Sequence, residues 1–156
     1  MNYIILLLIP IFLYSKMLNI GDQIGLIEIS DQKGKIHKLK ESQTLVVTWD
    51  RYTTSIANNY FDKNRDIFKS NNLIMIVDVS QTPSGIMNLF VLPKMRSYDH
   101  DILLSDDEAF NLTLPYSDHR VTIIHIEKRK VKDIKFVDDE IKLGEYLRKT
   151  VNRGIN

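Results

Sequence analysis

Two stretches of the chain are apolar without alternation, which is typical of strands that are covered on both faces. Residues 45–49 and residues 73–77 both show this pattern. Between them, Ser55 is positioned to cap a helix over residues 56–69, whose apolar residues gather near one face. Two buried strands joined by a helix predict a parallel pair with a right-handed crossover, because parallel strands need a long connection.

The flanking segments predict a hairpin at each end of this unit. Residues 26–29 and 35–39 are short β-like runs around a turn signal that ends in Gly34. Residues 121–126 and 131–136 flank a charged four-residue turn. These strands predict an extra amino-terminal hairpin and a closing hairpin that adds antiparallel strands to the parallel pair.

Three further helices complete the expected order. Pro83 stands where a helix can begin, and Pro93 is expected to end it. After a short strand at residues 102–104, the capping-box pattern at residues 105–108 opens a short helix, and a last helix covers residues 138–151. The order predicts an α/β fold in which a central mixed sheet carries helices on both faces.

The composition excludes several chemical activities but says little about the fold. The chain has 156 residues, no cysteine, and a formal net charge of +1. One domain is therefore expected, and the balanced charge predicts no nucleic-acid partner. Without cysteine, the chain itself cannot act as a thiol–disulfide oxidoreductase or a thiol peroxidase, and it has neither a disulfide nor a sulfur metal ligand.

The first fifteen residues differ from the rest of the chain because they are almost continuously apolar and uncharged until Lys16. The length of the run suits the apolar region of a secretory signal peptide and is too short to cross a bilayer as a helix. No Lys or Arg precedes the run, and Leu13 is large for a cleavage site after Ser15. We expect residues 1–15 to be a signal peptide, followed by one domain over residues 16–156; an uncleaved anchor and a buried amino-terminal element are the alternatives.

Three segments resemble the thioredoxin fold, in the variant with an extra amino-terminal hairpin found in peroxiredoxins and exported thioredoxin-like reductases. Residues 19–39 are similar to the opening stretch of that family, residues 45–49 to its first central strand, and residues 121–136 to its closing hairpin. The resemblance implies a thioredoxin-like domain over nearly the whole chain after residue 15. It also implies a redox motif directly after the first central strand.

Both halves of that redox site are replaced. The two cysteines would fall near residues 50–53, and the family places a cis-proline just before the closing hairpin, where this chain has His119 and Arg120. The Thr54-Ser55 turn, residues 89–91 and the polar segment before Val121 are also similar to small exported Cys-less proteins of the YtfJ type. The replaced cysteines and proline indicate a fold that is kept while its usual redox site is rebuilt, and no activity is carried over from the YtfJ-type proteins.

The candidate site follows from the rule that ligands of open α/β sheets bind outside the carboxyl ends of the parallel strands. At this edge we expect a binding surface made of Asp50, Arg51, Tyr52, Thr53, Thr54, Ser55, Asp78, His119 and Arg120. The carboxylates of Asp50 and Asp78 could share a proton or hold a hard cation, but capping of a helix or turn is the simpler interpretation. An anion at the hydroxyls of the helix start is a further alternative to ordinary capping.

Other polar clusters carry weaker signals. Residues 99–101 and 106–108 gather carboxylates and His100, but neighbours in sequence splay apart, so a solvated acidic loop is expected and no metal site is assigned. His125 lies inside a strand, where packing explains it, and the basic residues at 128–130 are expected to be a solvated hairpin tip. Hydrolase, phosphate-loop and zinc-peptidase motifs are all missing from the sequence, so no cofactor is expected.

The sequence therefore predicts an exported, non-catalytic binding or assembly module in the periplasm or another exported compartment, with another exported protein as its partner. No stable membrane span is expected unless the first segment stays uncleaved. A non-thiol enzyme or metal-binding protein that uses Asp50 and Asp78 is the alternative. Assistance to a cysteine-bearing partner is a third possibility, in which this chain exchanges no electrons itself.

Overall fold

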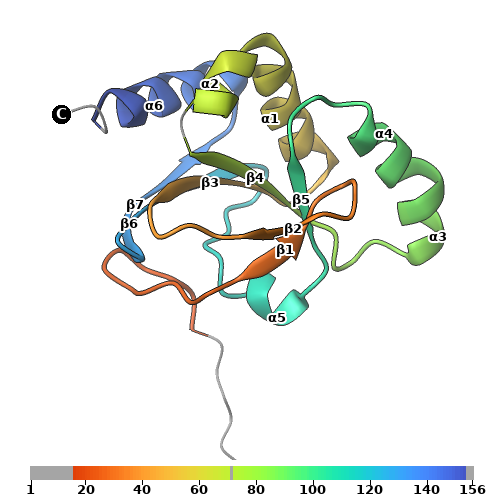
Figure 1. The fold of residues 1–156 in the computed structure, drawn as a ribbon, viewed down its shortest axis with the longest axis horizontal. Helices are drawn as coiled ribbons and strands as arrows, with labels where there is room; N and C mark the ends of the chain where they lie inside the picture. Colours follow the sequence, from red (N-terminus) through yellow and green to blue (C-terminus); the bar gives the residue numbers. More distant parts are fainter. Residues whose placement is uncertain (1–15, 71, 154–156) are drawn as a thin grey trace, which may run out of the picture.

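A five-stranded mixed sheet with the order β5–β4–β3–β6–β7 forms the centre of the structure (Figure 1). The computed structural model describes residues 16–70 and 72–153. The strands are β3 (Gln43–Thr48), β4 (Leu73–Asp78), β5 (Ile102–Ser105), β6 (Val121–Glu127) and β7 (Lys130–Val137). The predicted parallel pair is confirmed as β3 and β4, and the closing hairpin as β6 and β7, with β6 antiparallel to β3.

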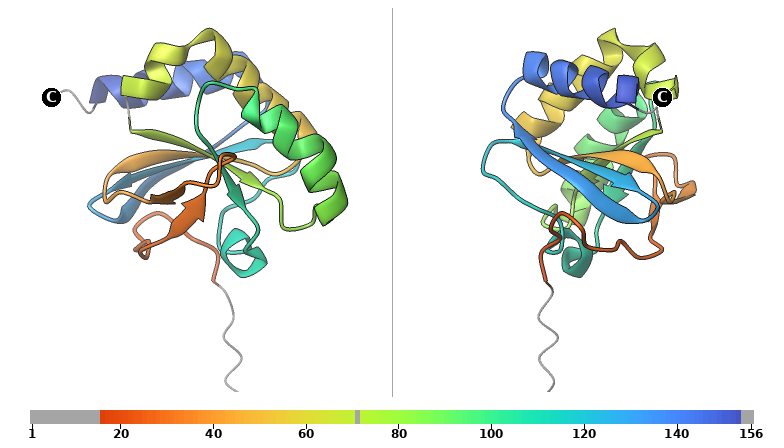
Figure 2. Two further views of the ribbon diagram at one scale, coloured as in Figure 1. Left: turned by 45° about the vertical axis from the view of Figure 1, so that its right-hand side comes forward. Right: turned by 90° about the vertical axis from the view of Figure 1, so that its left-hand side faces the viewer.

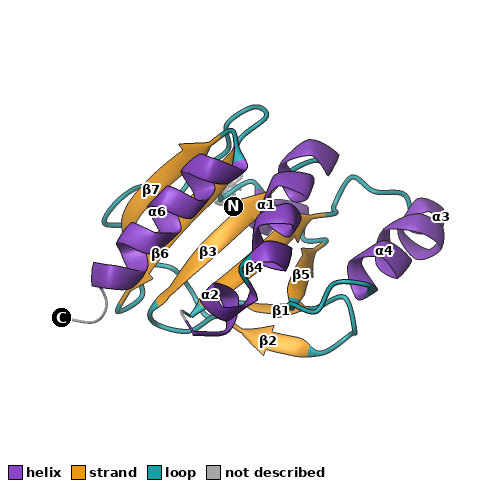
Figure 3. Cartoon of the chain, turned by 90° about the horizontal axis from the view of Figure 1, so that it is seen from above, coloured by secondary structure: helices purple, strands orange, loops and turns teal. Residues whose placement is uncertain are grey.

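Helices α1 (Arg51–Lys63), α2 (Arg65–Ser70) and α6 (Glu140–Arg153) cover one face of this sheet (Figure 3). A helical segment beside them consists of α3 (Ser84–Ile86), the π-helical turn η1 (Met87–Val91) and α4 (Leu92–Arg96). The short helix α5 (Glu108–Asn111) lies below the sheet in Figure 1, on the other face. The α/β class with helices on both faces is thereby confirmed.

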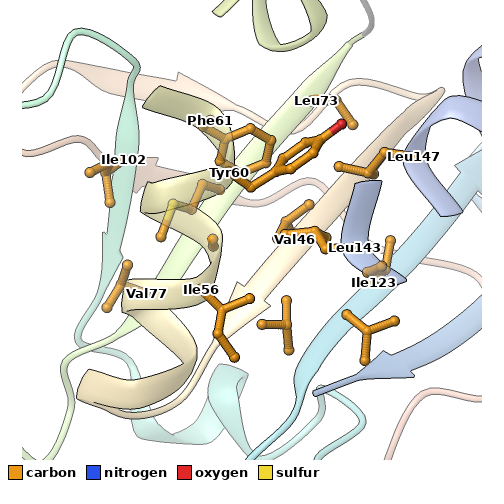
Figure 4. Close-up of a cluster of buried hydrophobic side chains, with 14 of the residues drawn as sticks. Val46, Ile56, Tyr60, Phe61, Leu73, Val77, Ile102, Ile123, Leu143 and Leu147 are labelled. Carbon is orange, nitrogen blue, oxygen red and sulfur yellow. The ribbon is translucent and has the colours of Figure 1, made fainter. Parts of the chain in front are cut away.

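Successive residues of the central strands point to opposite faces, and both faces are covered. On the α1 and α6 side, Val46 and Ile123 pack against Tyr60, Phe61, Leu143 and Leu147 (Figure 4). On the other side, Leu45, Val47, Ile76 and Ile124 pack against Ile24, Ile29, Leu39 and Leu114. Every residue of β3 is buried, which explains why this strand has no apolar–polar alternation.

The predicted amino-terminal hairpin is confirmed as β1 (Glu28–Ser30) and β2 (Ile36–Lys38), which form a separate two-stranded antiparallel sheet (Figure 2). The segment before it lies along β7, where the Gly21 N–H bonds to the Val131 carbonyl at 2.8 Å. The β1–β2 turn contacts β5 through the bridge between Asp31 and Leu103. This hairpin therefore covers the face of the sheet that the long helices leave open.

The prediction that Ser55 caps the first helix is wrong, because α1 begins at Arg51 and Asp50 is its N-cap. Asp50 accepts a hydrogen bond from the Thr53 N–H, and the Thr53 side chain accepts one from the Asp50 N–H, which is a capping box with Thr in the role usually filled by Glu or Gln. The helix also breaks at Asn64, so one predicted helix is two. Ser55 lies within the second turn and is exposed.

Two other predicted helix boundaries also move. Pro93 does not end its helix, because the chain reaches it through a π-helical turn and Pro93 then occupies the first turn of α4, where its missing N–H is not needed. Ser105 is not the cap of α5; Asp107 is, through the Phe110 N–H at 3.1 Å. Within the described residues, no helix is both long enough and apolar enough to span a bilayer. The predicted signal segment, residues 1–15, lies outside the described residues.

Candidate functional site

The carboxyl end of β3 leads straight into the capped start of α1, which is where the sequence places the former redox edge. Asp50 Oδ1 accepts from the Thr53 N–H at 2.7 Å and from the Thr53 hydroxyl at 2.9 Å. The Thr53 oxygen in turn accepts from the N–H groups of Trp49 at 3.0 Å and Asp50 at 3.1 Å. Asp50 and the buried Thr53 therefore hold the β3–α1 junction together.

Asp50 keeps its charge in this setting. Burial alone would raise the pKa of its carboxyl group, but the hydrogen bonds from Thr53 and the nearby His119 outweigh burial, so the pKa lies below its usual value. His119 Nδ1 lies 3.6 Å from Asp50 Oδ2. The result is an ionised carboxylate that serves mainly as a helix cap, which is the simpler of the two interpretations from sequence.

The resemblance to the thioredoxin fold places a cis-proline in the segment before β6, but among the described residues no peptide bond is cis. Trp49 anchors the segment, because its indole N–H donates to the Thr122 hydroxyl at 3.0 Å while that hydroxyl donates to the Pro115 carbonyl at 2.8 Å. The Trp49 and Tyr116 rings meet edge to face at 5.3 Å. His119 adopts a left-handed backbone conformation, with φ of +52°.

Asp78, at the end of β4, is also engaged in local structure. Its Oδ1 accepts from the Ser80 N–H at 2.9 Å, the Ser80 hydroxyl at 2.7 Å and the Asn111 side-chain amide at 2.7 Å. These bonds close the turn after β4 and tie it to α5. Like Asp50, Asp78 therefore matches the capping interpretation of the sequence.

A cleft of about 710 Å³ opens between α1 and the α3–α4 segment, beside the ends of β3 and β4. Five of the nine predicted site residues line it: Asp50, Arg51, Thr54, Ser55 and Asp78. The apolar walls come from residues that the sequence did not assign to a site, including Val79, Ile86, Phe90 and Met95. Ile86 is 50% exposed and Phe90 is 69% exposed, so the rim of the cleft presents bare apolar side chains to solvent.

Polar groups lie along the α1 wall of the cleft. The Thr54 hydroxyl is 2.9 Å from that of Thr48, and the Asn58 side-chain oxygen is 2.9 Å from His100 Nε2. Burial lowers the pKa of His100, while Asp62 and the neighbouring aspartates oppose the shift. The buried hydroxyl and amide pairs fix this wall of the cleft.

The other four predicted residues do not line the cleft. Thr53 is buried beneath the helix cap. Tyr52 is 56% exposed and its ring meets that of His119 edge to face at 6.3 Å. Arg120 lies in a shallow depression formed with β7 and α6 residues. The predicted surface is thus divided by the start of α1 into a cleft side and an exposed aromatic side.

The acidic run around residue 100 is not the uniform solvated loop expected from sequence. His100 is 8% exposed and packs among the rings of Phe61, Phe68 and Tyr98, whereas Asp99 is exposed and pairs with Arg65. His125 is explained by packing and local bonds, as expected, because its Nδ1 lies 3.0 Å from the Thr44 hydroxyl.

Comparison of the sequence with known proteins does not show a family for this chain. No protein-family model matches the sequence. The mouse (Mus musculus) cation channel sperm-associated targeting subunit tau is 25% identical over 116 residues, which cover 70% of this chain and only 5% of that protein. This chain therefore spans about a twentieth of that relative, and the identity is too low to show a family.

Comparison with solved structures shows the fold. Peroxidoxin BcpB from Mycobacterium tuberculosis matches with a TM-score of 0.58 at 15% identity, over 88% of this chain and 97% of that one. A cysteine-to-serine mutant of PrxQ from Xylella fastidiosa gives 0.56 at 12% identity, over 88% and 96%. An uncharacterised thioredoxin-like protein from Porphyromonas gingivalis gives 0.55 at 11% identity, over 87% and 96%. At these identities the likeness concerns the fold.

Proposed function

From a thioredoxin-like fold that contains no cysteine, we propose a non-catalytic binding module that holds an extended, partly apolar segment of another exported protein. The observation that carries the proposal is the rim of the cleft, where Ile86 and Phe90 remain half or more exposed although they belong to a helical segment that packs on the core. On soluble proteins, exposed apolar patches that are bordered by polar residues commonly mark interaction sites.

The shape and chemistry of the cleft suit a polypeptide better than a small polar metabolite. Its apolar wall, from α3 to α4, faces a polar wall on α1 that offers the exposed side chain of Ser55. Charges of both signs, from Arg51, Lys94, Asp50 and Asp78, also line it. An extended segment with alternating apolar and polar side chains would find partners on both walls.

A non-catalytic role fits the way in which the candidate acids are used. Asp50 Oδ1 and Asp78 Oδ1 each accept bonds that close a helix cap or a turn. Both carboxylates are therefore accounted for by local structure. The chain has no thiol to replace them as a nucleophile.

Export rests on the apolar residues 1–15 and is a separate part of the proposal. It is tested by expressing the full chain in its source cells, fractionating them, and determining the amino terminus by mass spectrometry. Cleavage near Ser15 in the exported fraction supports export with a removed signal peptide. An intact amino terminus in the cytosol contradicts it.

The binding proposal is tested with variants that change exposed side chains only. Phe90→Ser removes the more exposed of the two apolar rim side chains, and Leu112→Ser is a matched control because Leu112 is 63% exposed at the end of α5. Proteins captured by the immobilised wild-type chain are identified, and the affinity of each purified candidate is measured against all three chains. We expect a direct partner whose affinity falls at least about tenfold with Phe90→Ser and is unchanged with Leu112→Ser, since buried aromatic anchors dominate binding energies.

Equal loss with both variants, or no loss with either, contradicts the proposed surface. Substitution of Asp50 and Thr54 is less suitable for this test, because both residues support the fold at the β3–α1 junction.

A further inference from the structure

Two carboxylates and an imidazole converge at the edge where the β1–β2 hairpin meets β5, away from the cleft beside α1. One oxygen each from Asp31 and Asp101, and one ring nitrogen of His37, all lie within 4.8 Å of one another. They come from the β1–β2 turn, from β2, and from the residue before β5. Asp31 and Asp101 are far apart in the sequence, so the tertiary structure alone brings them together.

Gln32 holds the two halves of this cluster in place. Its side chain is fully buried, and it donates to the His100 carbonyl and accepts from the Ile102 N–H, both at 2.8 Å. Its own backbone N–H donates to the Ile102 carbonyl at 3.0 Å. Because Gln32 follows Asp31 and these bonds bracket Asp101, the two carboxylates are positioned by buried hydrogen bonds and not by chance surface contact.

The Asp31 carboxylate is itself oriented. Asp31 Oδ1 accepts from the N–H groups of Lys33 at 2.8 Å and Lys35 at 2.9 Å, which leaves Oδ2 directed at His37 Nε2, 2.7 Å away. Asp31 is 4% exposed, so this oxygen lies in a partly desolvated setting next to the imidazole. Ligands held by hydrogen bonds of this kind are typical of built metal sites.

We propose that Asp31, His37 and Asp101 bind one divalent transition-metal ion, with Zn²⁺ as the best fit. One imidazole and two carboxylates supply three protein ligands, and the partly exposed side of Asp101 leaves a fourth position for water. Four ligands at about 2.1 Å around zinc stand about 3.4 Å apart. The Asp31 and His37 ligand atoms, 2.7 Å apart, would separate slightly, and since all three atoms lie within 4.8 Å of one another, small side-chain movements bring the cluster to this spacing. The imidazole nitrogen favours zinc over Mg²⁺ and Ca²⁺, which prefer oxygen ligands only.

Two existing contacts compete with the ion. The hydrogen bond between His37 Nε2 and Asp31 Oδ2 has to give way to metal coordination. Lys33 Nζ lies 3.7 Å from Asp101 Oδ1, but both side chains are about half exposed, so this ion pair is weak and Lys33 can swing away.

The test is calorimetric titration of the untagged, metal-free full chain with ZnCl₂, MgCl₂ and CaCl₂. We expect one Zn²⁺ per chain, and at least about tenfold weaker binding in both His37→Gln and Asp101→Asn, since loss of even an outer partner costs that much at metal sites. The matched controls are His125→Gln and Asp99→Asn, which remove the same side chains outside the cluster and should leave the affinity unchanged. Lys33→Gln should tighten binding.

Nuclear magnetic resonance of the imidazole nitrogens identifies the ligand directly. Zinc should shift the His37 resonances and leave those of His125 in place. No Zn²⁺ binding, or binding that survives both His37→Gln and Asp101→Asn, overturns the assignment. Equal binding of Mg²⁺ overturns the preference for zinc. Because these residues lie outside the cleft, the result is independent of the binding proposal.

Discussion

Gly144, in the middle of α6, is the position where local propensity and tertiary packing disagree most sharply. Alanine is favoured over glycine in the interior of a helix by about 1 kcal/mol, so propensity alone predicts that Gly144→Ala is stabilising. A Cβ at this position, however, would lie 2.7 Å from Tyr60 Cε2 and 3.4 Å from Tyr60 Cζ. Glycine is thus what allows α6 to approach the Tyr60 ring of α1.

The size of the effect follows from how far the ring would have to move. Carbon atoms pack best at roughly 3.5–4.0 Å, so Tyr60 would have to shift by about 1 Å. Tyr60 is 2% exposed and lies in the cluster of Figure 4, where Phe61 and Leu147 also pack. Overpacking of a filled core costs about 1–3 kcal/mol, which exceeds or matches the propensity gain. We therefore expect Gly144→Ala to lower the free energy of unfolding by up to about 2 kcal/mol.

Urea denaturation, followed by circular dichroism and extrapolated linearly, measures this change. Gly85→Ala is the control, because Gly85 is exposed in α3 and a Cβ there meets nothing within 4 Å. It should stabilise the protein by up to about 1 kcal/mol. In a Tyr60→Leu background, where the ring is gone, Gly144→Ala should lose its penalty. A Gly144→Ala chain more stable than the wild type would refute the argument.

Two further predictions concern the predicted site and its surroundings. Asp50→Ala should lower the free energy of unfolding by about 1 kcal/mol in the same denaturation assay, because it removes the α1 cap, whereas Asp50→Ser should keep most of it; equal losses would show that capping is not what Asp50 contributes. His100 has a pKa lowered from 6.5, chiefly by burial, so the folded state binds fewer protons than the unfolded state. The stability present above about pH 7 should therefore fall as the pH drops towards about 5. His100→Gln should flatten that part of the curve, and an unchanged slope would contradict the assignment.

Much of the fold could be predicted from the sequence because its signals are local. The unalternated strands β3 and β4 and the two hairpins follow from patterns a few residues long, and all of them are observed. The wrong boundaries arose where side chains compete. Asp and Ser are both favourable N-cap residues, but Asp50 is the cap here because it lies at the end of β3 and Thr53 completes the capping box. Pro93 is tolerated inside a helical segment because a π-turn precedes it.

Part of the lining of the cleft could be predicted from the sequence. Asp50 to Ser55 and Asp78 could be placed at the sheet edge, since that edge follows from strand direction. Phe90 and Ile86 were assigned to a helix without any indication that they would stay exposed beside α1. Whether an apolar residue faces the core or a cleft depends on how two distant segments pack, and no local pattern carries that information.

The sequence by itself determined what this protein cannot do. With no cysteine it performs no thiol chemistry of its own, whatever its fold, because reactivity requires the atom. Only the tertiary structure decided which of the remaining groups meet. As the sequence predicts, the side chains of residues 99–101 point in different directions. Asp99 pairs with Arg65 and His100 lies in the core, whereas Asp101 lies near Asp31 and His37. The approach of Asp101 to Asp31 and His37 depends on the pairing of segments that are far apart in the chain. Strand register and the Gln32 hydrogen bonds fix this pairing, and no local sequence pattern encodes it.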